Sequence, residues 1–188
     1  MITAADVALH TPGNVAYDWA ETNYFSIYIP EANITAWVYV IARPGVGACV
    51  ADIQAINTIG RLGIEAHYAD FQQHLPMPAR LENFTLPNGL SIRTSNEPRD
   101  YRIDYVGLNG TELHLDVHGL MEPYDIHDPD MDPLAPRERN DSGFGSAYSN
   151  HFDMSARITG TAMFHNQSYA VDCVATMDHS WGPRSERG

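Results

Sequence analysis

The most reactive group of side chains in this sequence lies near its C-terminal end. Residues 178–184 read Asp-His-Ser-Trp-Gly-Pro-Arg and bring together a carboxylate, an imidazole, a hydroxyl, an indole and a guanidinium. An imidazole beside an indole can protonate an alkene, hold an enolate or orient a carbonyl. We therefore take His179 as the candidate catalytic acid or base, with Asp178 as its orienting partner. Arg184 is the candidate anchor for an anion or a carbonyl, and Trp181 the candidate cavity wall.

A β-strand through this segment would divide these side chains, because successive residues of a strand point to opposite faces. Asp178 and Ser180 would share one face, and His179 and Trp181 the other. The alternative without chemistry is a strand end at which Trp181 plugs a barrel and Arg184 pairs with an acid. The residue types alone leave both interpretations open.

Two further histidines are candidates for contact with a substrate. Residues 112–118 alternate acids with imidazoles and end at His118. Two histidines four residues apart on a strand have Cα atoms about 13 Å apart, so they cannot share a metal by themselves. This polar face is either solvated or directed into a barrel, and in the second case His118 contacts the substrate. His151, two residues before Asp153, is a candidate at the start of another strand.

Aromatic residues complete the set of candidates. Residues 34–41 read Ile-Thr-Ala-Trp-Val-Tyr-Val-Ile, an aromatic and β-branched composition typical of a strand. We expect Trp37 and Tyr39 of this run to bind the substrate.

The sequence contains no motif for a cofactor. Residues 125–132 carry four carboxylates and a histidine that suit a hard cation, but they lack the glycine and the terminal glutamate of an EF-hand loop. H-E-x-x-H, G-x-S-x-G, G-x-G-x-x-G and a phosphate loop are absent. All 11 basic residues are arginine, which excludes a lysine Schiff base. We expect neither a metal nor an organic cofactor.

The chain is acidic, with 24 acids against 11 bases and a formal net charge of −13. Such a surface repels phosphate backbones and anionic lipid, so we expect no nucleic-acid partner and no stable membrane insertion. Cys49 and Cys173 belong to no C-x-x-C motif, no leader opens the chain, and no apolar run has the length of a transmembrane helix. These features predict a cytoplasmic protein.

Short β-patterned runs predict an all-β domain. They lie at residues 24–29, 34–41, 48–56, 80–86, 90–94, 101–108 and 111–120, and in a final hairpin within residues 148–184. Turn signals separate them, of which Asn109-Gly110 is the strongest, and residues 58–75 fit a strand or one short helix. The spacing favours an antiparallel barrel of about eight to ten strands with little helix, closed on itself and wide enough for one small ligand.

The same pattern divides the chain into three parts. Residues 1–22 are expected to wrap the body, residues 23–184 to form the single barrel domain, and residues 185–188 to form a tail. A long acidic, proline-rich loop is expected at residues 121–146, within the barrel domain.

Residues 178–184 resemble the DHSWG-type signature of the AttH-like, lipocalin-like proteins related to carotenoid 1,2-hydratase (hydroxyneurosporene synthase). Residues 21–26, 124–129 and 151–160 are also similar to that family, and the resemblance spans residues 17–184. It implies a calycin-like antiparallel barrel that binds a hydrophobic small molecule, such as a terpenoid, a polyene or a polyketide, without an organic cofactor. The positions that it carries over are Asp178, His179, Trp181, Arg184 and His151.

Members of that family usually contain two such barrels in tandem, and this sequence is similar to the N-terminal one. Three arrangements stay open: a fragment, a homodimer that replaces the missing barrel, or a single degenerate barrel. The function is expected to be acid–base catalysis on an apolar molecule by hydration, isomerisation or cyclisation. A carrier that binds such a molecule without converting it, or a half-domain that needs a second barrel, is the alternative.

Overall fold

The computed structural model describes residues 1–11, 14–132 and 150–184. Within them the chain forms one antiparallel sheet of eleven strands and three short 3-10 helices, which confirms the predicted all-β, lipocalin-like class. The strands are β1 (Trp19–Ile29), β2 (Ile34–Arg43), β3 (Ala48–Ile56), β4 (Tyr68–Pro76), β5 (Asn83–Thr85), β6 (Leu90–Asn96), β7 (Asp100–Val106), β8 (Glu112–Gly119), β9 (Tyr124–Asp125), β10 (Asn150–Phe164) and β11 (Gln167–Pro183). The helices are η1 (Ala4–Val7), η2 (Pro30–Ala32) and η3 (Gly63–Glu65). In the described part of the chain, none of these helices has the length and apolar character to cross a membrane.

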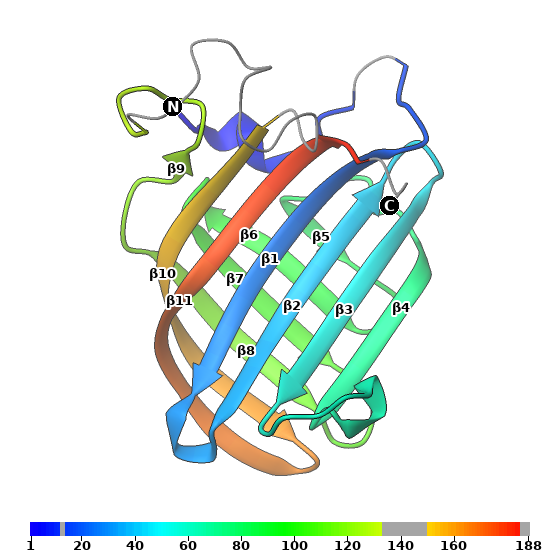
Figure 1. Cartoon of the computed structure of the whole chain (residues 1–188), viewed down its shortest axis with the longest axis vertical. Helices are drawn as coiled ribbons and strands as arrows, with labels where there is room; N and C mark the ends of the chain where they lie inside the picture. The colour runs from blue at the N-terminus through cyan, green and yellow to red at the C-terminus, as the bar shows by residue number, and fades with distance from the viewer. Residues whose placement is uncertain (12–13, 133–149, 185–188) are drawn as a thin grey trace.

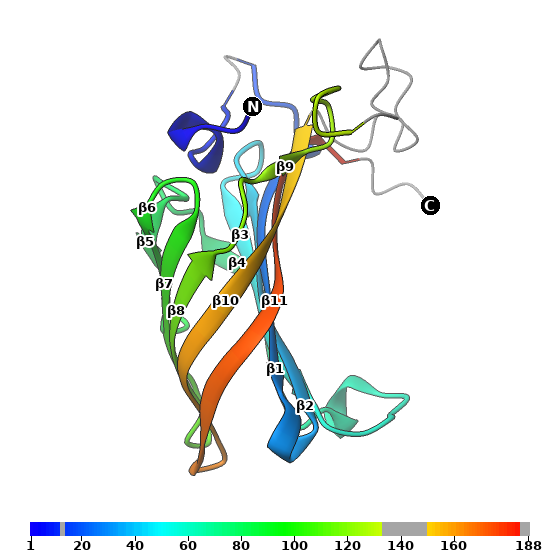
Figure 2. The same ribbon diagram turned by 90° about the vertical axis from the view of Figure 1, so that its left-hand side faces the viewer.

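The sheet is curled into a half-barrel (Figure 1; Figure 2). Its strand order is β4-β3-β2-β1-β11-β10-β8-β7-β6-β5, and β9 pairs with β10. The long hairpin of β10 and β11 lies at the bend, so that β1 to β4 form one wall and β5 to β8 form the wall that faces it. The sequence predicted a closed barrel, but among the described strands the edges β4 and β5 do not pair with each other. The predicted closed barrel was therefore wrong in one respect, because no backbone hydrogen bonds join β4 and β5, the two edge strands of the described sheet.

Side chains join the two walls where backbone pairing does not. The hydroxyl of Tyr68 on β4 lies 2.5 Å from the hydroxyl of Tyr105 on β7. The Tyr105 hydroxyl donates to Asp70 Oδ2 at 2.9 Å, and Asn88 Nδ2 donates to the same atom at 3.1 Å. This network connects β4 to β7 and to the turn before β6.

Alternating burial explains why these runs are strands. Along β2 every second residue is fully buried, and the residues between are exposed or half-buried. β-branched and aromatic side chains suit such a pleated, half-buried surface. The predicted turn at Asn109-Gly110 is present, with φ of 57° and 63° at these two residues. Glycine and asparagine adopt this left-handed conformation most readily.

The inward-facing side chains form one continuous core between the walls. Phe25 of β1 packs against Tyr101 of β7, with ring centroids 5.2 Å apart. The largest fully buried side chains come from both walls: Phe25, Ile27, Ile29, Ile34, Ile53, Leu90, Ile92, Ile103 and Tyr105, with Phe152 and Phe164 from β10. Buried side chains of the two facing walls thus belong to one contiguous cluster.

Several boundaries differ from those predicted. The first strand begins at Trp19 rather than at Tyr24. Residues 58–75 contain η3 followed by most of β4, so both interpretations of this segment hold in part. The segment predicted as a long loop contains β9, and residues 133–146 of it, like the predicted tail at 185–188, lie outside the described residues.

Candidate functional site

The chemically dense segment is the end of β11 and its side chains alternate between the two faces of the sheet. His179 and Trp181 point inward and are 0% and 6% exposed. Asp178 and Ser180 point outward, toward Arg184, which follows the strand. The alternation is what a strand requires, and it divides the predicted site into an inner and an outer part.

The outer part is a pocket of about 320 Å³ over four adjacent strands. We call it the outer pocket. Its lining residues are Tyr24 of β1, Tyr39 of β2, His151 of β10, Asp178 and Ser180 of β11, and Arg184. The pairing register explains the convergence, because Tyr24 is the partner of Tyr39 on one side and of Asp178 on the other. The structure thus brings together four of the predicted site residues: Tyr39, His151, Asp178 and Arg184.

Arg184 is held in the outer pocket by fixed oxygen atoms. Its Nη2 donates to Ser180 Oγ at 2.5 Å, and its Nη1 donates to the Tyr39 hydroxyl at 3.3 Å. Ser180 Oγ lies 2.8 Å from Thr22 Oγ1, and the Arg184 backbone N–H donates to the Asp18 carbonyl at 2.6 Å. The guanidinium is therefore oriented before any ligand binds.

Asp178 is the acid of the outer pocket. Burial raises its pKa to about 6, and the neighbouring Asp153 acts in the same direction, whereas His151 and Arg184 oppose the rise. Burial and the charge of Asp178 also raise the pKa of Tyr24. His151 Nε2 lies 3.0 Å from Asp153 Oδ2. A carboxyl with a pKa of about 6 can give and take a proton near neutral pH.

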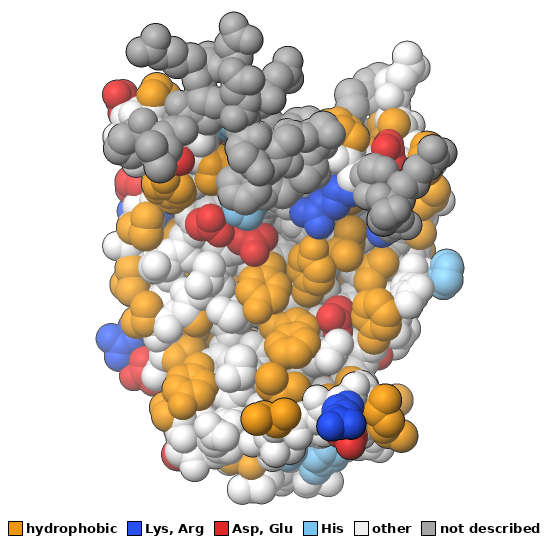
Figure 3. Space-filling model, in the orientation of Figure 1, with side chains coloured by type: hydrophobic (Ala, Val, Ile, Leu, Met, Phe, Trp, Pro, Cys, Tyr) orange, Lys and Arg blue, Asp and Glu red, His pale blue; other side chains and the backbone are white. Residues whose placement is uncertain are grey.

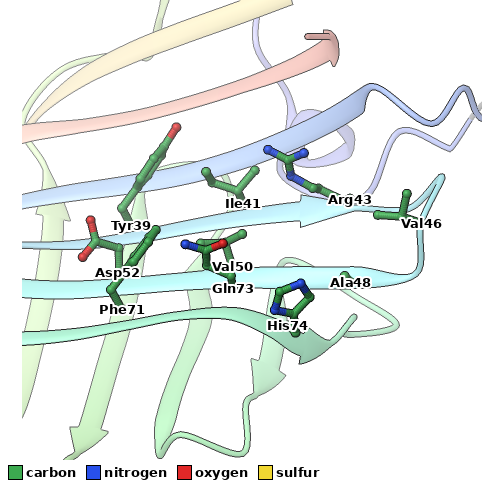
Figure 4. A pocket seen from close by; sticks show the side chains of 10 residues that line it. All are labelled: Tyr39, Ile41, Arg43, Val46, Ala48, Val50, Asp52, Phe71, Gln73 and His74. Carbon is green, nitrogen blue, oxygen red and sulfur yellow. The ribbon is translucent and has the colours of Figure 1, made fainter. Parts of the chain in front are cut away.

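A second pocket, of about 490 Å³, adjoins the outer pocket and shares Tyr39 with it. Figure 4 shows its side chains rising from β2, β3 and β4, with Ile41, Val50 and Phe71 as its apolar part. Trp37, on the same face of β2, donates from Nε1 to Asp52 Oδ2 at 3.1 Å, and Asp52 lines this second pocket. At Tyr39 the polar groups of the outer pocket therefore adjoin the apolar side chains of the second pocket.

The inner part surrounds His179. Its Nδ1 lies 2.6 Å from Asn23 Oδ1, and burial, together with the nearby His10 and His151, lowers its pKa to about 3. The imidazole is therefore neutral at physiological pH. Asp178 was predicted to orient His179. This was wrong, because neighbouring residues on a strand face opposite sides of the sheet. Asn23, whose Oδ1 contacts His179 Nδ1, orients the imidazole instead.

The remaining candidate, His118, lies apart from the outer pocket. It is on β8, where its register partner on β10 is Arg157, and its ring is 67% exposed and 2.9 Å from Asp100. Of the two alternatives left open for residues 112–118, the solvated face holds for His118, which therefore does not meet the other candidate site residues. Sequence reasoning missed Tyr24 as a pocket residue, because its place depends on pairing across β1, β2 and β11.

The fold and the outer pocket define an antiparallel, lipocalin-like half-barrel with ionisable groups gathered on its outer face. The chain belongs to the family described as a domain of unknown function, DUF7064, whose model matches residues 3–188. No protein of curated function matches the chain.

A solved structure from Nitrosomonas europaea, described as a "putative AttH", has a similar fold, with a TM-score of 0.53 and 11% sequence identity. The likeness covers 90% of this chain and 53% of that one, so the chain spans about half the length of that neighbour. The AttH-like fold implied by residues 178–184 is thereby confirmed, and the relation to carotenoid 1,2-hydratase stays a prediction.

Proposed function

We propose that the outer pocket binds a hydrophobic small molecule through one of its oxygen atoms, and that Asp178 transfers protons during its conversion. The observation that carries the proposal is the convergence of an oriented guanidinium, a desolvated carboxyl and two tyrosines in one half-open pocket of about 320 Å³. Concave sites with a few convergent polar groups and a perturbed pKa are typical of small-molecule sites.

Arg184 is the anchor of the ligand in this proposal. Ser180 and Tyr39 already fix its guanidinium, so less side-chain freedom is lost when a carboxylate or a carbonyl oxygen binds. The apolar body of the ligand lies along Ile41 and Phe71 of the adjoining pocket. This arrangement suits terpenoid and polyene molecules that end in an oxygen group.

Asp178 supplies the proton. Its protonated carboxyl donates to a double bond of the bound molecule, and the resulting carboxylate takes a proton back when water adds, a ring closes or the double bond moves. Hydration, isomerisation and cyclisation share this step. His179, the acid or base predicted from the sequence, lies on the other face of the sheet and takes no part.

Two substitutions separate binding from catalysis. Native mass spectrometry of the protein with a panel of terpenoid and polyene acids, aldehydes and alcohols identifies a ligand, and calorimetry measures its affinity. We expect Arg184→Gln to weaken binding by about 10-fold or more, because hydrogen bonds to charged groups contribute about 1.5–3 kcal/mol. We expect Asp178→Asn to retain binding and to lower turnover by about 10²–10⁴-fold.

Matched controls are Arg157→Gln and Asp172→Asn. These residues form an exposed ion pair at 2.8 Å between β10 and β11, away from the outer pocket. An equal loss in the controls, or no binding by any member of the panel, contradicts the proposal. Binding that depends on Arg184 without any turnover supports the carrier instead.

A second candidate function is that of a half-domain whose outer face packs against another barrel. Figure 3 shows hydrophobic side chains spread over this face, and Tyr28, Phe71 and Val174 are 44%, 54% and 65% exposed. The similar fold from Nitrosomonas europaea belongs to a longer chain, of which the likeness covers 53%. Analytical ultracentrifugation distinguishes the two candidates: a dimer that Phe71→Glu dissociates favours packing, and a monomer at all concentrations favours the ligand pocket.

A further inference from the structure

The inner face carries a separate cluster of ligating groups. His10 lies in the N-terminal segment, Glu21 near the start of β1 and His179 near the end of β11. One ligand atom from each of the three residues lies within 4.8 Å of the other two. Since Asp178 and His179 face opposite sides of the sheet, this cluster is independent of the outer pocket.

His179 presents an unused lone pair to the cluster. Its Nδ1 lies 2.6 Å from Asn23 Oδ1, which can only accept, so the ring proton is on Nδ1 and Nε2 carries the lone pair. Nε2 is fully buried and has no hydrogen-bond partner among the described residues. A histidine that donates its other ring N–H to an oxygen is typical of metal ligands.

Glu21 is a buried carboxylate, with an exposure of 0%. It accepts hydrogen bonds from the His10 backbone N–H at 2.7 and 2.9 Å and from Trp19 Nε1 at 3.0 Å. Among the described residues its one ion-pair partner is the His10 ring, at 3.2 Å. A compensating positive charge stabilises a buried anion further than hydrogen bonds alone, and a bound cation supplies it directly.

Aromatic rings fix the geometry around these groups. Trp181 stacks on His10 with a centroid distance of 3.9 Å and an interplanar angle of 3°. Phe152 and Trp181 each lie 5.3 Å from the His179 ring. An apolar shell of this kind limits access of water to a metal and strengthens its binding.

We propose that His10, Glu21 and His179 bind a divalent transition-metal ion, with Zn²⁺ as the probe. Two imidazoles and a carboxylate are a ligand set that Zn²⁺ and neighbouring metals accept, and they leave a fourth position open. Metal–ligand distances near 2.0–2.2 Å require ligand atoms that lie up to 4.8 Å apart to move closer together. The bound ion ties the N-terminal segment to β1 and β11.

Isothermal titration calorimetry of the chelator-treated full chain with Zn²⁺ tests this proposal. We expect one ion per chain in the wild type. Glu21→Gln and His10→Asn should each weaken binding by more than the 10–100-fold that loss of an outer-shell partner costs. His165→Asn is the matched control, because His165 lies in an exposed turn with φ of 52°, which asparagine tolerates. Zn²⁺ at about 100 times its Kd should raise the Tm of the wild type by about 5–10 °C.

X-ray absorption of the Zn²⁺-loaded wild type keeps the proposal testable if a variant does not fold. We expect scattering from two imidazoles and oxygen neighbours without sulfur. Three results would each overturn the proposal. They are no binding of Zn²⁺ to the wild type, an affinity that Glu21→Gln and His10→Asn leave unchanged, and a spectrum without imidazole scattering.

Discussion

The contact between Asn23 and His179 allows the inner face to be tested by a double-mutant cycle. Both side chains are buried, at 2% and 0% exposure, and they are joined by one hydrogen bond of 2.6 Å. Asn23→Leu keeps the volume but removes the acceptor. The imidazole cannot escape by changing tautomer, because Nε2 also has no hydrogen-bond partner among the described residues.

The magnitude follows from the cost of a buried, unsatisfied polar group. Asn23→Leu leaves the His179 N–H unpaired and should destabilise the fold by about 1–3 kcal/mol. His179→Phe leaves the Asn23 amide unpaired and should cost about the same. The double substitution replaces both polar groups by apolar ones of similar shape and should be nearly neutral. For a chain of this length, each single substitution lowers the Tm by about 2–12 °C.

Urea denaturation followed by tryptophan fluorescence, in buffer containing a chelator, gives the free energies of unfolding of the wild type and of the three variants. The expected interaction energy is favourable and close in size to the sum of the two single costs, because the double substitution is expected to cost almost nothing. Two outcomes refute the reasoning: single variants that differ from the wild type by less than about 0.5 kcal/mol, or a double variant whose cost is the sum of the two.

Three further predictions concern other parts of the fold. The Arg102 guanidinium lowers the pKa of Asp104 to about 2, below its ordinary value. The stability that this ion pair contributes is therefore present above about pH 4 and is lost as pH falls toward 2. Urea midpoints measured at these pH values should show a smaller loss of stability for Arg102→Gln than for the wild type. Gly160 has φ of 139°, and an added Cβ would lie 2.0 Å from a carbonyl oxygen of β8. Gly160→Ala should therefore cost at least about 1–3 kcal/mol in thermal unfolding, and an unchanged Tm would contradict this. Burial raises the pKa of the Cys49 thiol to about 12, whereas Cys173 is half-buried. A disulfide reagent at pH 8 should therefore react rapidly with Cys173 alone, and Cys173→Ser should abolish the rapid phase.

The strand pattern could be predicted from the sequence because it depends on neighbours along the chain. Alternation along residues 34–41 and the turn at Asn109-Gly110 are local signals, and both elements formed as predicted. The opposite orientation of Asp178 and His179 also followed from alternation alone. Closure of the barrel did not follow, since it depends on the curvature of the whole sheet and on whether β4 meets β5.

The composition of the two clusters could not be predicted because each depends on long-range pairing. Tyr24 enters the outer pocket through its register with Asp178, and that register is fixed only when β1 and β11 meet. His10 reaches His179 because the N-terminal segment packs across the end of the half-barrel, where its ring stacks on Trp181. No local signal in residues 1–11 indicates this contact.

The position of a bound ligand tests the proposed function most directly. Intermolecular nuclear Overhauser effects can be measured between the protein and the ligand retained in native mass spectra. We predict contacts from the ligand to the rings of Tyr24 and Tyr39 on the outer face, which Arg184→Gln removes. Contacts to Phe152 and His179 on the inner face, unaffected by Arg184→Gln, would contradict the assignment of the outer pocket as the functional site.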